Sequence, residues 1–457
     1  MATFTSKAIF EHAEVPLADD GRWEALVDHW TARSAPTRSA SDEERTIYVA
    51  SVGTGRDPVA RRAQLGEILS LVRTEGGRVV GHEICVLAEP NPRTLLGVGT
   101  AEAVAARARA SGATMLVLDA ELTPSQTRNL EDVANIPVCD REAIILNVFL
   151  RHARTRRAKI QVEIAQLEYL RPRIRGVGLD MDQQTGGTTR ARGPGETASE
   201  LLARKLDSRL DALKKALRRI ETSATTQRRQ RTNCRRIVLV GYTNAGKTSL
   251  MNALTAADLS ARDRPFETLD TTSRCLTRHG GDVLVSDTVG FIRRLPERLL
   301  ASFESTLAEI AEASLIVVVV DASDAERELH LRTTGDILTR MGAGEIPRFY
   351  VFNKLDLVGE EEGRDFASWS EGHPWAALSA TDARGVADLE AALLGAARVD
   401  EEELTLFVRY DAAELLGLVY GKCRVLESVA SAGGLTLRVR GPRSVVTRLR
   451  MKRGGKR

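Results

Sequence analysis

The stretch 237-IVLVGYTNAGKT-248 decides the fold of the central part of the chain. An apolar run with strand character, residues 237–240, leads into the pattern G-x-x-x-x-G-K-[ST], and a helical pattern follows. In this context the glycines let backbone amides curl around a phosphate, Lys247 reaches the outer phosphate oxygens, and the Thr248 hydroxyl can bind Mg²⁺. The sequence therefore predicts a phosphate-binding loop at the N-terminus of a helix.

Two later motifs stand in the order expected of a GTPase. The tetrapeptide 287-DTVG-290 follows an apolar run, so Asp287 can hold Mg²⁺ through water and the Gly290 amide can contact a γ-phosphate. The tetrapeptide 353-NKLD-356 follows another apolar run, and the Asp356 carboxylate can accept hydrogen bonds from the N1 and N2 donors of guanine. Adenine lacks this donor pair and would leave a buried acceptor unsatisfied. The order of these motifs predicts GTP and GDP as ligands.

The mobile part of the site is predicted in 266-FETLD-270, which lies between the phosphate-binding loop and the first of these tetrapeptides. Thr268 is the threonine expected to close on Mg²⁺ when a γ-phosphate is present, with Thr271 and Thr272 as alternatives. Where GTPases of the Ras type carry a glutamine that orients the attacking water, this chain has Phe291. The sequence therefore leaves the water-positioning group, and with it the catalytic residue, unknown.

The predicted nucleotide-binding residues come from five segments: residues 241–248, 266–270, 287–290, 353–356 and 379–380. Asn353 would brace the loop, the Lys354 stem would cover the guanine ring, and Ser379 and Ala380 would complete the base pocket. The full predicted set is Gly241, Tyr242, Thr243, Asn244, Ala245, Gly246, Lys247, Thr248, Phe266, Glu267, Thr268, Leu269, Asp270, Asp287, Thr288, Val289, Gly290, Asn353, Lys354, Leu355, Asp356, Ser379 and Ala380, with Thr248 and Thr268 as Mg²⁺ ligands.

The composition is that of a soluble globular protein with two or three packed domains: 457 residues, 43% hydrophobic and 28% charged. The five cysteines are far apart without CxxC spacing, which fits a reducing cytosol, and the seven histidines show no i, i+4 pairing. The N-terminus has no apolar core of signal-peptide length, and the most apolar run, residues 314–320, is too short to span a bilayer. We expect a cytoplasmic monomer without a membrane span.

The alternation of strand and helix patterns predicts an α/β fold with a doubly wound, mostly parallel sheet in the GTPase domain. A small α/β domain and a long antiparallel helical hairpin precede it, and a small α+β unit follows it. The predicted boundaries are residues 1–45 for a loose leader, 46–140 for the α/β domain, 141–222 for the hairpin with a glycine-rich tip at 176–196, 223–235 for a basic linker, 236–397 for the GTPase domain and 398–457 for the C-terminal unit with its basic tail.

For two of the predicted helices the sequence also indicates where each begins and ends. The segment from Arg141 to about Arg171 contains no Gly or Pro and predicts one long helix as the first arm of the hairpin. In the C-terminal unit, an amphipathic helix is expected from about Ala413 to Val429, between strands at 404–408 and 435–439.

Several motifs outside the nucleotide loops carry a resemblance to a known family. They are 124-PSQTRNLE-131, the pair Asp140 and Arg141, 161-QVEIAQLEYL-170, 193-GPGET-197 and 287-DTVGFIRRLPERLLASFESTL-307. With them, the chain from about Pro90 to Ala397 resembles the HflX family of ribosome-associated GTPases, as a diverged member. It departs from the usual pattern at Thr100, where the family has lysine, at Asn147, where it has aspartate, and at Thr271, where it has proline.

The resemblance implies a partner and a role. In this family the loop of the hairpin is implied to enter the large ribosomal subunit near the peptidyl-transferase centre, and the family rescues or splits stalled ribosomes. An apolar residue at the position of Phe291 implies that GTP hydrolysis is slow alone and stimulated by the ribosome. The resemblance thus predicts an Mg²⁺-dependent GTPase that associates with the large subunit and its ribosomal RNA.

Two alternatives remain open from the sequence. The first is a GTP-dependent regulatory switch that acts on a protein partner without RNA, in which case the basic segments serve only solubility. The second is an additional nucleotide site or an RNA-remodelling activity in the N-terminal domain, whose only support is the glycine turn 97-GVGT-100.

Overall fold

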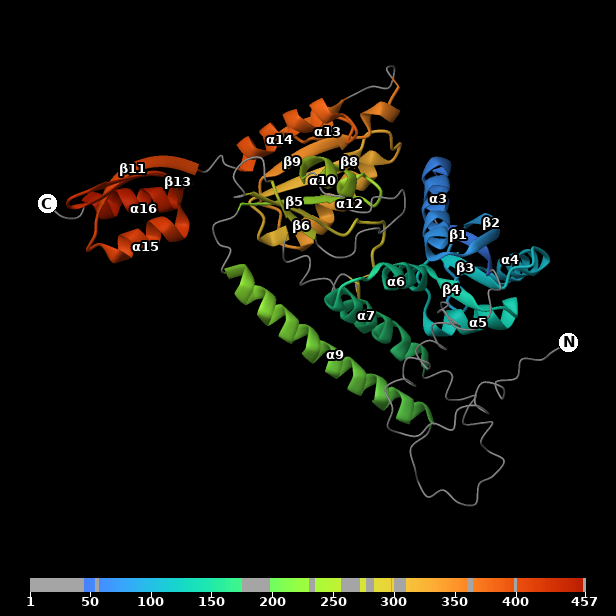
Figure 1. Cartoon of the computed structure of the whole chain (residues 1–457). Helices are drawn as coiled ribbons and strands as arrows, with labels where there is room; N and C mark the ends of the chain where they lie inside the picture. Colours follow the sequence, from blue (N-terminus) through green and yellow to red (C-terminus); the bar gives the residue numbers. More distant parts are fainter. Residues whose placement is uncertain are drawn as a thin grey trace. The chain divides into compact units, whose positions relative to one another are not determined.

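The computed structural model describes residues 45–53, 57–174, 198–229, 235–255, 272–276, 283–296, 298–299, 310–359, 365–397 and 401–454. These residues contain three β-sheets and a pair of long helices, shown in Figure 1. Among them, the chain divides into two compact units between Arg151 and His152. The predicted leader up to residue 44, the hairpin tip at 176–196 and the threonine loop at 266–271 lie outside the described residues.

The N-terminal unit is built on a parallel sheet. Its elements are β1 (Thr46–Gly53), α3 (Pro58–Glu75), β2 (Arg78–Val86), α4 (Val98–Ala110), β3 (Met115–Asp119), α5 (Pro124–Ala134), β4 (Val138–Asp140) and α6 (Arg141–His152). The strand order is β2-β1-β3-β4, and each pair is parallel. Strands β1 and β3 are almost wholly buried, which explains their uninterrupted apolar character. The predicted α/β fold of this region is confirmed.

A buried ion pair closes the carboxyl edge of this sheet. Asp119, the last residue of β3, is fully buried, and its Oδ1 lies 2.6 Å from Arg141 Nη1. Its Oδ2 accepts a hydrogen bond from Gln64 Nε2 at 2.8 Å. Arg141 Nη2 also lies 3.1 Å from Glu67 Oε1. Because a buried carboxylate is costly unless its charge is matched, this arginine fastens the start of α6 to the sheet.

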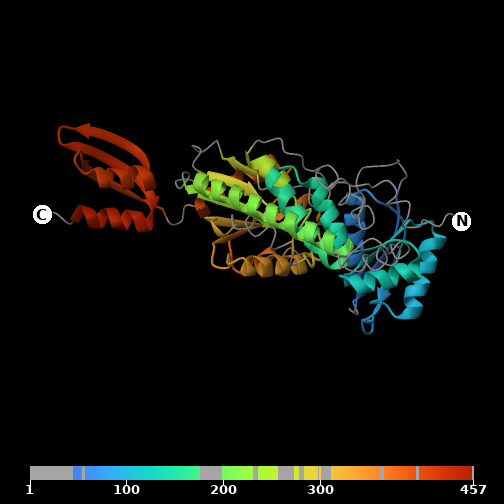
Figure 2. The ribbon, with the colours of Figure 1, turned by 90° about the horizontal axis from the view of Figure 1, so that it is seen from below.

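The helical hairpin consists of α7 (Arg156–Ile174) and α9 (Ala198–Arg229), which run antiparallel and side by side in Figures 1 and 2. Salt bridges link their flanks, with Arg209 Nη2 at 2.8 Å from Glu163 Oε1 and Lys214 Nζ at 2.7 Å from Glu168 Oε1. The apolar rows of the two helices contain the buried side chains Ile160, Ile164, Leu167, Leu206, Leu210 and Leu213. The predicted antiparallel pair of long helices is confirmed.

The limits of the hairpin helices differ from the prediction. One helix from Arg141 to about Arg171 is wrong, because α6 ends at His152 and α7 begins at Arg156. Thr155 starts the second helix, since its Oγ1 accepts the Ala158 amide N–H at 3.1 Å and caps the first turn. At the other end, α9 continues to Arg229, into the stretch predicted as a basic linker. Arginine and glutamine are both good helix formers, so a basic, polar stretch can continue a helix.

The GTPase domain is a six-stranded sheet with helices. Its elements are β5 (Arg235–Gly241), α10 (Lys247–Thr255), β6 (Thr272–Cys275), β7 (Val283–Asp287), β8 (Leu315–Asp321), α12 (Arg327–Arg340), β9 (Arg348–Asn353), the 3₁₀ helix η2 (Leu355–Leu357), α13 (Phe366–Trp369), β10 (Trp375–Ala377) and α14 (Ala383–Ala397). The order is β10-β9-β8-β5-β7-β6, and only β6 runs antiparallel to its neighbour. The doubly wound, mostly parallel fold is confirmed.

The strand order fixes the position of the phosphate-binding loop. Strand β5 lies between β7 and β8, so the chain leaves β5 at the point where the strand order reverses direction. In open α/β sheets this switch point, at the carboxyl ends of the strands, is where ligands bind. Because β7, β8 and β9 run parallel to β5 or to each other, their carboxyl ends meet at the same edge of the sheet.

The C-terminal unit is a three-stranded antiparallel sheet with the order β11-β13-β12. Its elements are β11 (Glu401–Arg409), α15 (Ala413–Lys422), β12 (Arg424–Ser431), β13 (Gly434–Pro442) and α16 (Arg443–Gly454), and Figure 2 shows both helices on one face of the sheet. The helix expected up to Val429 is wrong, because it ends at Lys422 and Arg424–Ser431 form a strand. Pairing with β13 outweighs the local helical pattern there.

No described helix is both long and apolar enough to cross a membrane. Among the described cysteines, Cys85, Cys139 and Cys423 are buried, whereas Cys275 is exposed on β6.

Candidate nucleotide-binding site

The phosphate-binding loop needs glycine at two positions. Gly241 has a φ of +149°, and a Cβ placed on it would lie 2.2 Å from the Val319 carbonyl oxygen of β8. Gly246 has a φ of +86°, and its Cβ would lie 2.2 Å from Asn353 Nδ2. Both glycines therefore meet a steric and a conformational requirement that no other residue satisfies. The close approach of neighbouring strands holds the loop in its curled form.

Lys247, the first residue of α10, points back across the loop. It is buried, and its Nζ donates hydrogen bonds to the carbonyl oxygens of Gly241 at 3.1 Å and Tyr242 at 2.8 Å. Burial lowers the pKa of Lys247 to about 8, and the nearby negative charge of Asp287 opposes that shift. A phosphate group beside this nitrogen would stabilise its charged form, which is what a phosphate-binding lysine requires.

Thr248 and Asp287 lie together beside Lys247. The Thr248 hydroxyl donates to Asp287 Oδ2 at 2.7 Å, and Asp287 is fully buried at the end of β7. Hydroxyl and carboxylate oxygens are the hard ligands that Mg²⁺ prefers, and the ion usually keeps several waters and takes its remaining ligands from substrate phosphates. One hydroxyl and one carboxylate next to a phosphate-binding loop therefore fit Mg²⁺. Thr268, the second predicted ligand, lies outside the described residues.

The segment after Asp287 runs along the loop. The Phe291 amide donates to the Gly241 carbonyl oxygen at 3.0 Å, and the Thr243 amide donates to the Phe291 carbonyl oxygen at 2.7 Å. A Cβ on Gly290 would lie 2.8 Å from Thr243 Cα and 3.1 Å from Lys247 Nζ, so the backbone is in close contact with the loop there. The Phe291 side chain is only 1% exposed. Its backbone faces the loop while its ring belongs to the core.

The residues predicted to select guanine are placed by Asn353. Its Nδ2 donates to the Ala245 carbonyl oxygen of the loop at 2.9 Å, and its Oδ1 accepts the Ala380 amide at 2.9 Å. Lys354 has a φ of +60°, and its Nζ lies 2.8 Å from Asp321 Oδ2 at the end of β8. Asp356 is exposed in η2. One side chain thus joins the phosphate-binding loop to both predicted base-binding segments.

The described residues of the predicted set therefore gather at one edge of the sheet. The loop 241–248, the tetrapeptide 287–290 and Asn353 with Ala380 are linked by the hydrogen bonds given above. Ser379 bonds locally to the Thr381 hydroxyl at 2.8 Å. Residues 266–270 of the set lie outside the described part of the chain, so their contribution stays a prediction.

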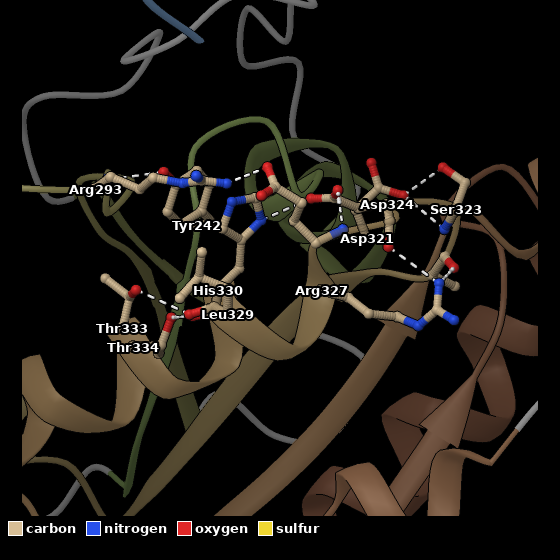
Figure 3. Close-up of polar contacts among 12 residues, drawn as sticks. Tyr242, Arg293, Asp321, Ser323, Asp324, Arg327, Leu329, His330, Thr333 and Thr334 are labelled. Carbon is tan, nitrogen blue, oxygen red and sulfur yellow. Dashed lines mark hydrogen bonds and ion pairs between the residues drawn. The ribbon is translucent and has the colours of Figure 1, made fainter. Parts of the chain in front are cut away.

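Sequence reasoning missed a polar cluster next to the loop, shown in Figure 3. The ring of Tyr242 stacks on His330 with a centroid distance of 3.5 Å and an interplanar angle of 12°. His330 Nδ1 lies 2.6 Å from Asp324 Oδ2, and Arg293 forms an ion pair with Glu326. Of these five residues, Tyr242 lies in the phosphate-binding loop and Arg293 in the stretch 287–307, whereas Asp324, Glu326 and His330 lie in no motif quoted above. The available signal was the acidic segment 321-DASDAE-326 directly after a buried strand, which a parallel sheet carries to the same edge.

The surroundings shift the pKa values of the Asp324 and Glu326 carboxylates in opposite directions. Burial alone would raise the pKa of Asp324, but the hydrogen bond from His330 and the backbone N–H of Glu326 outweigh it and hold that pKa below its usual value. Burial raises the pKa of Glu326, and Arg293 opposes the shift. The surroundings therefore favour the charged form of Asp324 and disfavour that of Glu326.

Comparison with known proteins divides the chain into three matched regions. Residues 62–150 match a family model described as GTP-binding GTPase N-terminal, residues 152–231 match GTP-binding GTPase Middle Region, and residues 236–354 match 50S ribosome-binding GTPase. Together these models cover most of the chain.

Individual relatives agree with these models. The GTPase HflX of Spirochaeta thermophila is 47% identical over 273 residues, which cover 59% of this chain and 67% of that protein. The GTPase HflX of Gluconacetobacter diazotrophicus is 37% identical over 434 residues, or 86% of this chain and 94% of its own. Among solved structures, a GTP-binding protein of Sulfolobus solfataricus in complex with GDP is similar over 77% of this chain and 98% of its own, with 21% identity and a TM-score of 0.43.

Proposed function

Because this chain belongs to the HflX family of GTPases, we propose that it uses GTP binding and hydrolysis to control its attachment to the large ribosomal subunit. The chain is a GTP-hydrolysing enzyme, and the finer assignments of partner, metal and residues are the proposal. The observation that carries the ribosomal partner is the match of residues 236–354 to the model of 50S ribosome-binding GTPases. A ribosomal partner implies that the protein works in the cytoplasm and rescues or dissociates stalled ribosomes.

The proposed site divides the work among three groups of residues. The amides of the loop 241–248 and the Lys247 ammonium bind the phosphates, and the Asp356 carboxylate accepts the guanine N1 and N2 donors. Thr248 directly, and Asp287 through water, would hold Mg²⁺. Bound there, Mg²⁺ supplies positive charge to the oxygens of the β- and γ-phosphates. Water attacks the γ-phosphorus, and the bond to the bridging oxygen breaks, which gives GDP and phosphate.

The proposed rate behaviour follows from Phe291. Its ring is buried, so it has neither the chemistry nor the position to orient water. Hydrolysis without a partner is therefore slow, and the ribosome accelerates it by completing the site. This acceleration distinguishes an enzyme coupled to the ribosome from a free-standing switch.

The hairpin offers a surface for ribosomal RNA. Lys215, Arg218 and Arg219 are exposed on one stretch of α9, and exposed cations of this kind contact phosphates. Their neutralisation tests the proposal. Changing all three to glutamine should weaken binding to purified large subunits and make it less sensitive to salt, with the slope reduced by roughly one for each phosphate that the variant no longer binds. GTP affinity should stay the same.

A matched control is available on α12, where Arg332 and Arg340 are also exposed. Changing both of these to glutamine should leave subunit binding unaltered. GTP turnover with and without large subunits, in one buffer, is the second measurement. Turnover that large subunits do not increase, together with a shallow salt dependence, would instead favour the regulatory switch acting on a protein partner.

Base selectivity tests the guanine assignment separately. Asp356→Asn should shift preference from GTP toward xanthine nucleotides, because xanthine presents an acceptor where guanine presents a donor. Equal affinity of the unaltered protein for ATP and GTP would contradict the role of Asp356.

A further inference from the structure

Tyr242 connects the phosphate-binding loop to the segment that follows 287-DTVG-290. Its hydroxyl oxygen accepts the backbone N–H of Arg293 at 2.7 Å. With the two backbone bonds between Phe291 and the loop, this makes three hydrogen bonds that fix residues 291–293 against residues 241–243. One of these three bonds therefore depends on the orientation of the Tyr242 phenol ring.

That ring is held from outside the nucleotide motifs. Tyr242 is only 9% exposed and stacks on His330, which lies in the first turn of α12. The side chain of His330 is 12% exposed, and its Nδ1 is fixed by Asp324. Figure 3 shows the two rings lying face to face, with Asp324 beside His330. The start of α12 thus sets the angle of the Tyr242 ring.

The side chain of Arg293 is fixed as well. Its guanidinium pairs with Glu326, and both side chains are 14% exposed. Glu326 belongs to the same short connection between β8 and α12 as Asp324. Arg293 is therefore held twice by neighbouring groups, through its amide and through its side chain.

These contacts bear on the reaction because of what lies between them. Gly290 and Phe291 lie three and two positions before Arg293, and the Gly290 backbone is in contact with the loop beside Lys247 Nζ. In Ras-type GTPases a glutamine side chain orders the water at this place. Phe291 supplies no such side chain here, and the backbone at this place is held by the polar cluster.

We infer that Tyr242, His330, Arg293 and Glu326 are positioning residues for GTP hydrolysis, which hold the backbone of residues 290–293 against the phosphate-binding loop. They act through the segment and do not touch the reacting atoms. The inference concerns the intrinsic reaction and is independent of the ribosomal partner.

Tyr242→Phe in the full-length protein is the most direct test. It keeps the ring and the stack on His330 but removes the oxygen that accepts the Arg293 amide. Small displacements of reacting groups cost up to about a hundredfold, so the single-turnover rate of GTP hydrolysis without ribosomes should fall roughly tenfold or more. GDP affinity should change by less than about twofold, because the loop amides and Asp356 are untouched.

Substitutions at His330 and Glu326 extend the test. His330→Ala removes the stack and should lower the rate in the same way, whereas His330→Phe keeps an aromatic partner and should restore most of it. Glu326→Gln should lower the rate by releasing Arg293. Tyr350 and His373 form a similar stack in the same domain, with a centroid distance of 5.7 Å and an angle of 25°, so His373→Ala is the matched control and should leave the rate unchanged.

Two results would overturn the inference. If Tyr242→Phe and His330→Ala hydrolysed GTP at the normal rate, the cluster would have no part in the reaction. If the rate fell only in step with GDP affinity and thermal stability, and His330→Phe restored none of it, the cluster would be a structural support of the domain.

Discussion

In each of the two α/β sheets of this protein an internal strand ends in a fully buried aspartate, and the partners of the two carboxylates differ. Asp119 in the N-terminal unit lies against the guanidinium of Arg141. Asp287 in the GTPase domain accepts from the Thr248 hydroxyl, next to a lysine whose pKa is only about 8. An arginine matches the carboxylate permanently and fastens the fold, whereas a hydroxyl in a phosphate-binding loop suits a carboxylate that serves a bound cation.

The glycine-containing segments at the two sheets differ in their backbone conformation and in the space left for a side chain. Gly97 has a φ of −59°, and a Cβ on it would come no closer than 3.9 Å to Thr100 Oγ1. A Cβ on Gly99 would meet nothing within 4 Å. Gly241 and Gly246, by contrast, have positive φ values and no room for a side chain. Gly97 precedes α4 and residues 98–100 begin that helix, so the expected glycine turn 97-GVGT-100 is the start of a helix that does not need its glycines and gives no support to an additional nucleotide site.

Removing the arginine should have the largest effect. Arg141→Ala leaves Asp119 buried without its opposite charge, and breaking such a pair costs roughly 3–5 kcal/mol. We expect the free energy of unfolding of the N-terminal unit to fall by that amount in a denaturant titration. GDP affinity should remain normal. A loss below about 1 kcal/mol would show that Asp119 and Asp287 do not differ as described.

The second-largest effect is expected at Gly246, where the structure leaves no space for a side chain. Gly246→Ala places a methyl group at 2.2 Å from Asn353 Nδ2 and forces alanine into a left-handed conformation, which costs about 1–3 kcal/mol before any clash. GDP affinity, measured by calorimetry, should fall about a hundredfold or more. Gly99→Ala, in the first turn of α4, is the control at the other sheet; it should leave GDP affinity unchanged and should not lower stability, because alanine favours a helix more than glycine does. If Gly246→Ala and Gly99→Ala changed GDP affinity to the same extent, the two segments would not differ in their need for glycine.

The lysine beside Asp287 predicts a dependence of binding on pH. In the free protein the pKa of Lys247 is about 8, and a neighbouring phosphate raises it. Below pH 8 the lysine is charged in both states, so GDP affinity should be constant there. Above pH 8 binding must take up a proton, and affinity should fall toward about tenfold per pH unit. Calorimetry between pH 7 and 9 checks this; a flat profile would mean that Lys247 keeps an ordinary pKa.

The smallest effect is expected at Phe291. Leucine fills a similar apolar space, so Phe291→Leu should change the intrinsic rate of hydrolysis by less than about threefold, since volume-conserving exchanges disturb a core little. Phe291→Gln should not accelerate hydrolysis, because the position is 1% exposed and faces the core. It should instead lower thermal stability by burying an amide. A faster Phe291→Gln enzyme would show that this side chain can reach the water.

The sequence predicted the parts of the site that depend on neighbouring residues. A strand, a glycine loop and a helix follow one another within 237–255, so their geometry is local and the motif reports it. The break after His152 could not be predicted, because it depends on the capping hydroxyl of Thr155 in a segment without glycine or proline. The Tyr242–His330 stack joins distant parts of the chain with no shared periodicity, and only the meeting of strand ends brings them together.

The two hydrogen bonds of the Asn353 side chain bear on when the nucleotide site becomes complete during translation. The phosphate-binding loop is translated first. Its Ala245 carbonyl oxygen accepts from Asn353, which lies 108 positions later in the chain and which also accepts the Ala380 amide. Domains made on the ribosome fold as units, with earlier parts waiting for later ones. A nascent chain that ends before β9 therefore contains the complete phosphate-binding motif but lacks the side chain that braces it. We therefore expect competence to bind nucleotide to be acquired late in translation, when the predicted guanine-binding segments emerge.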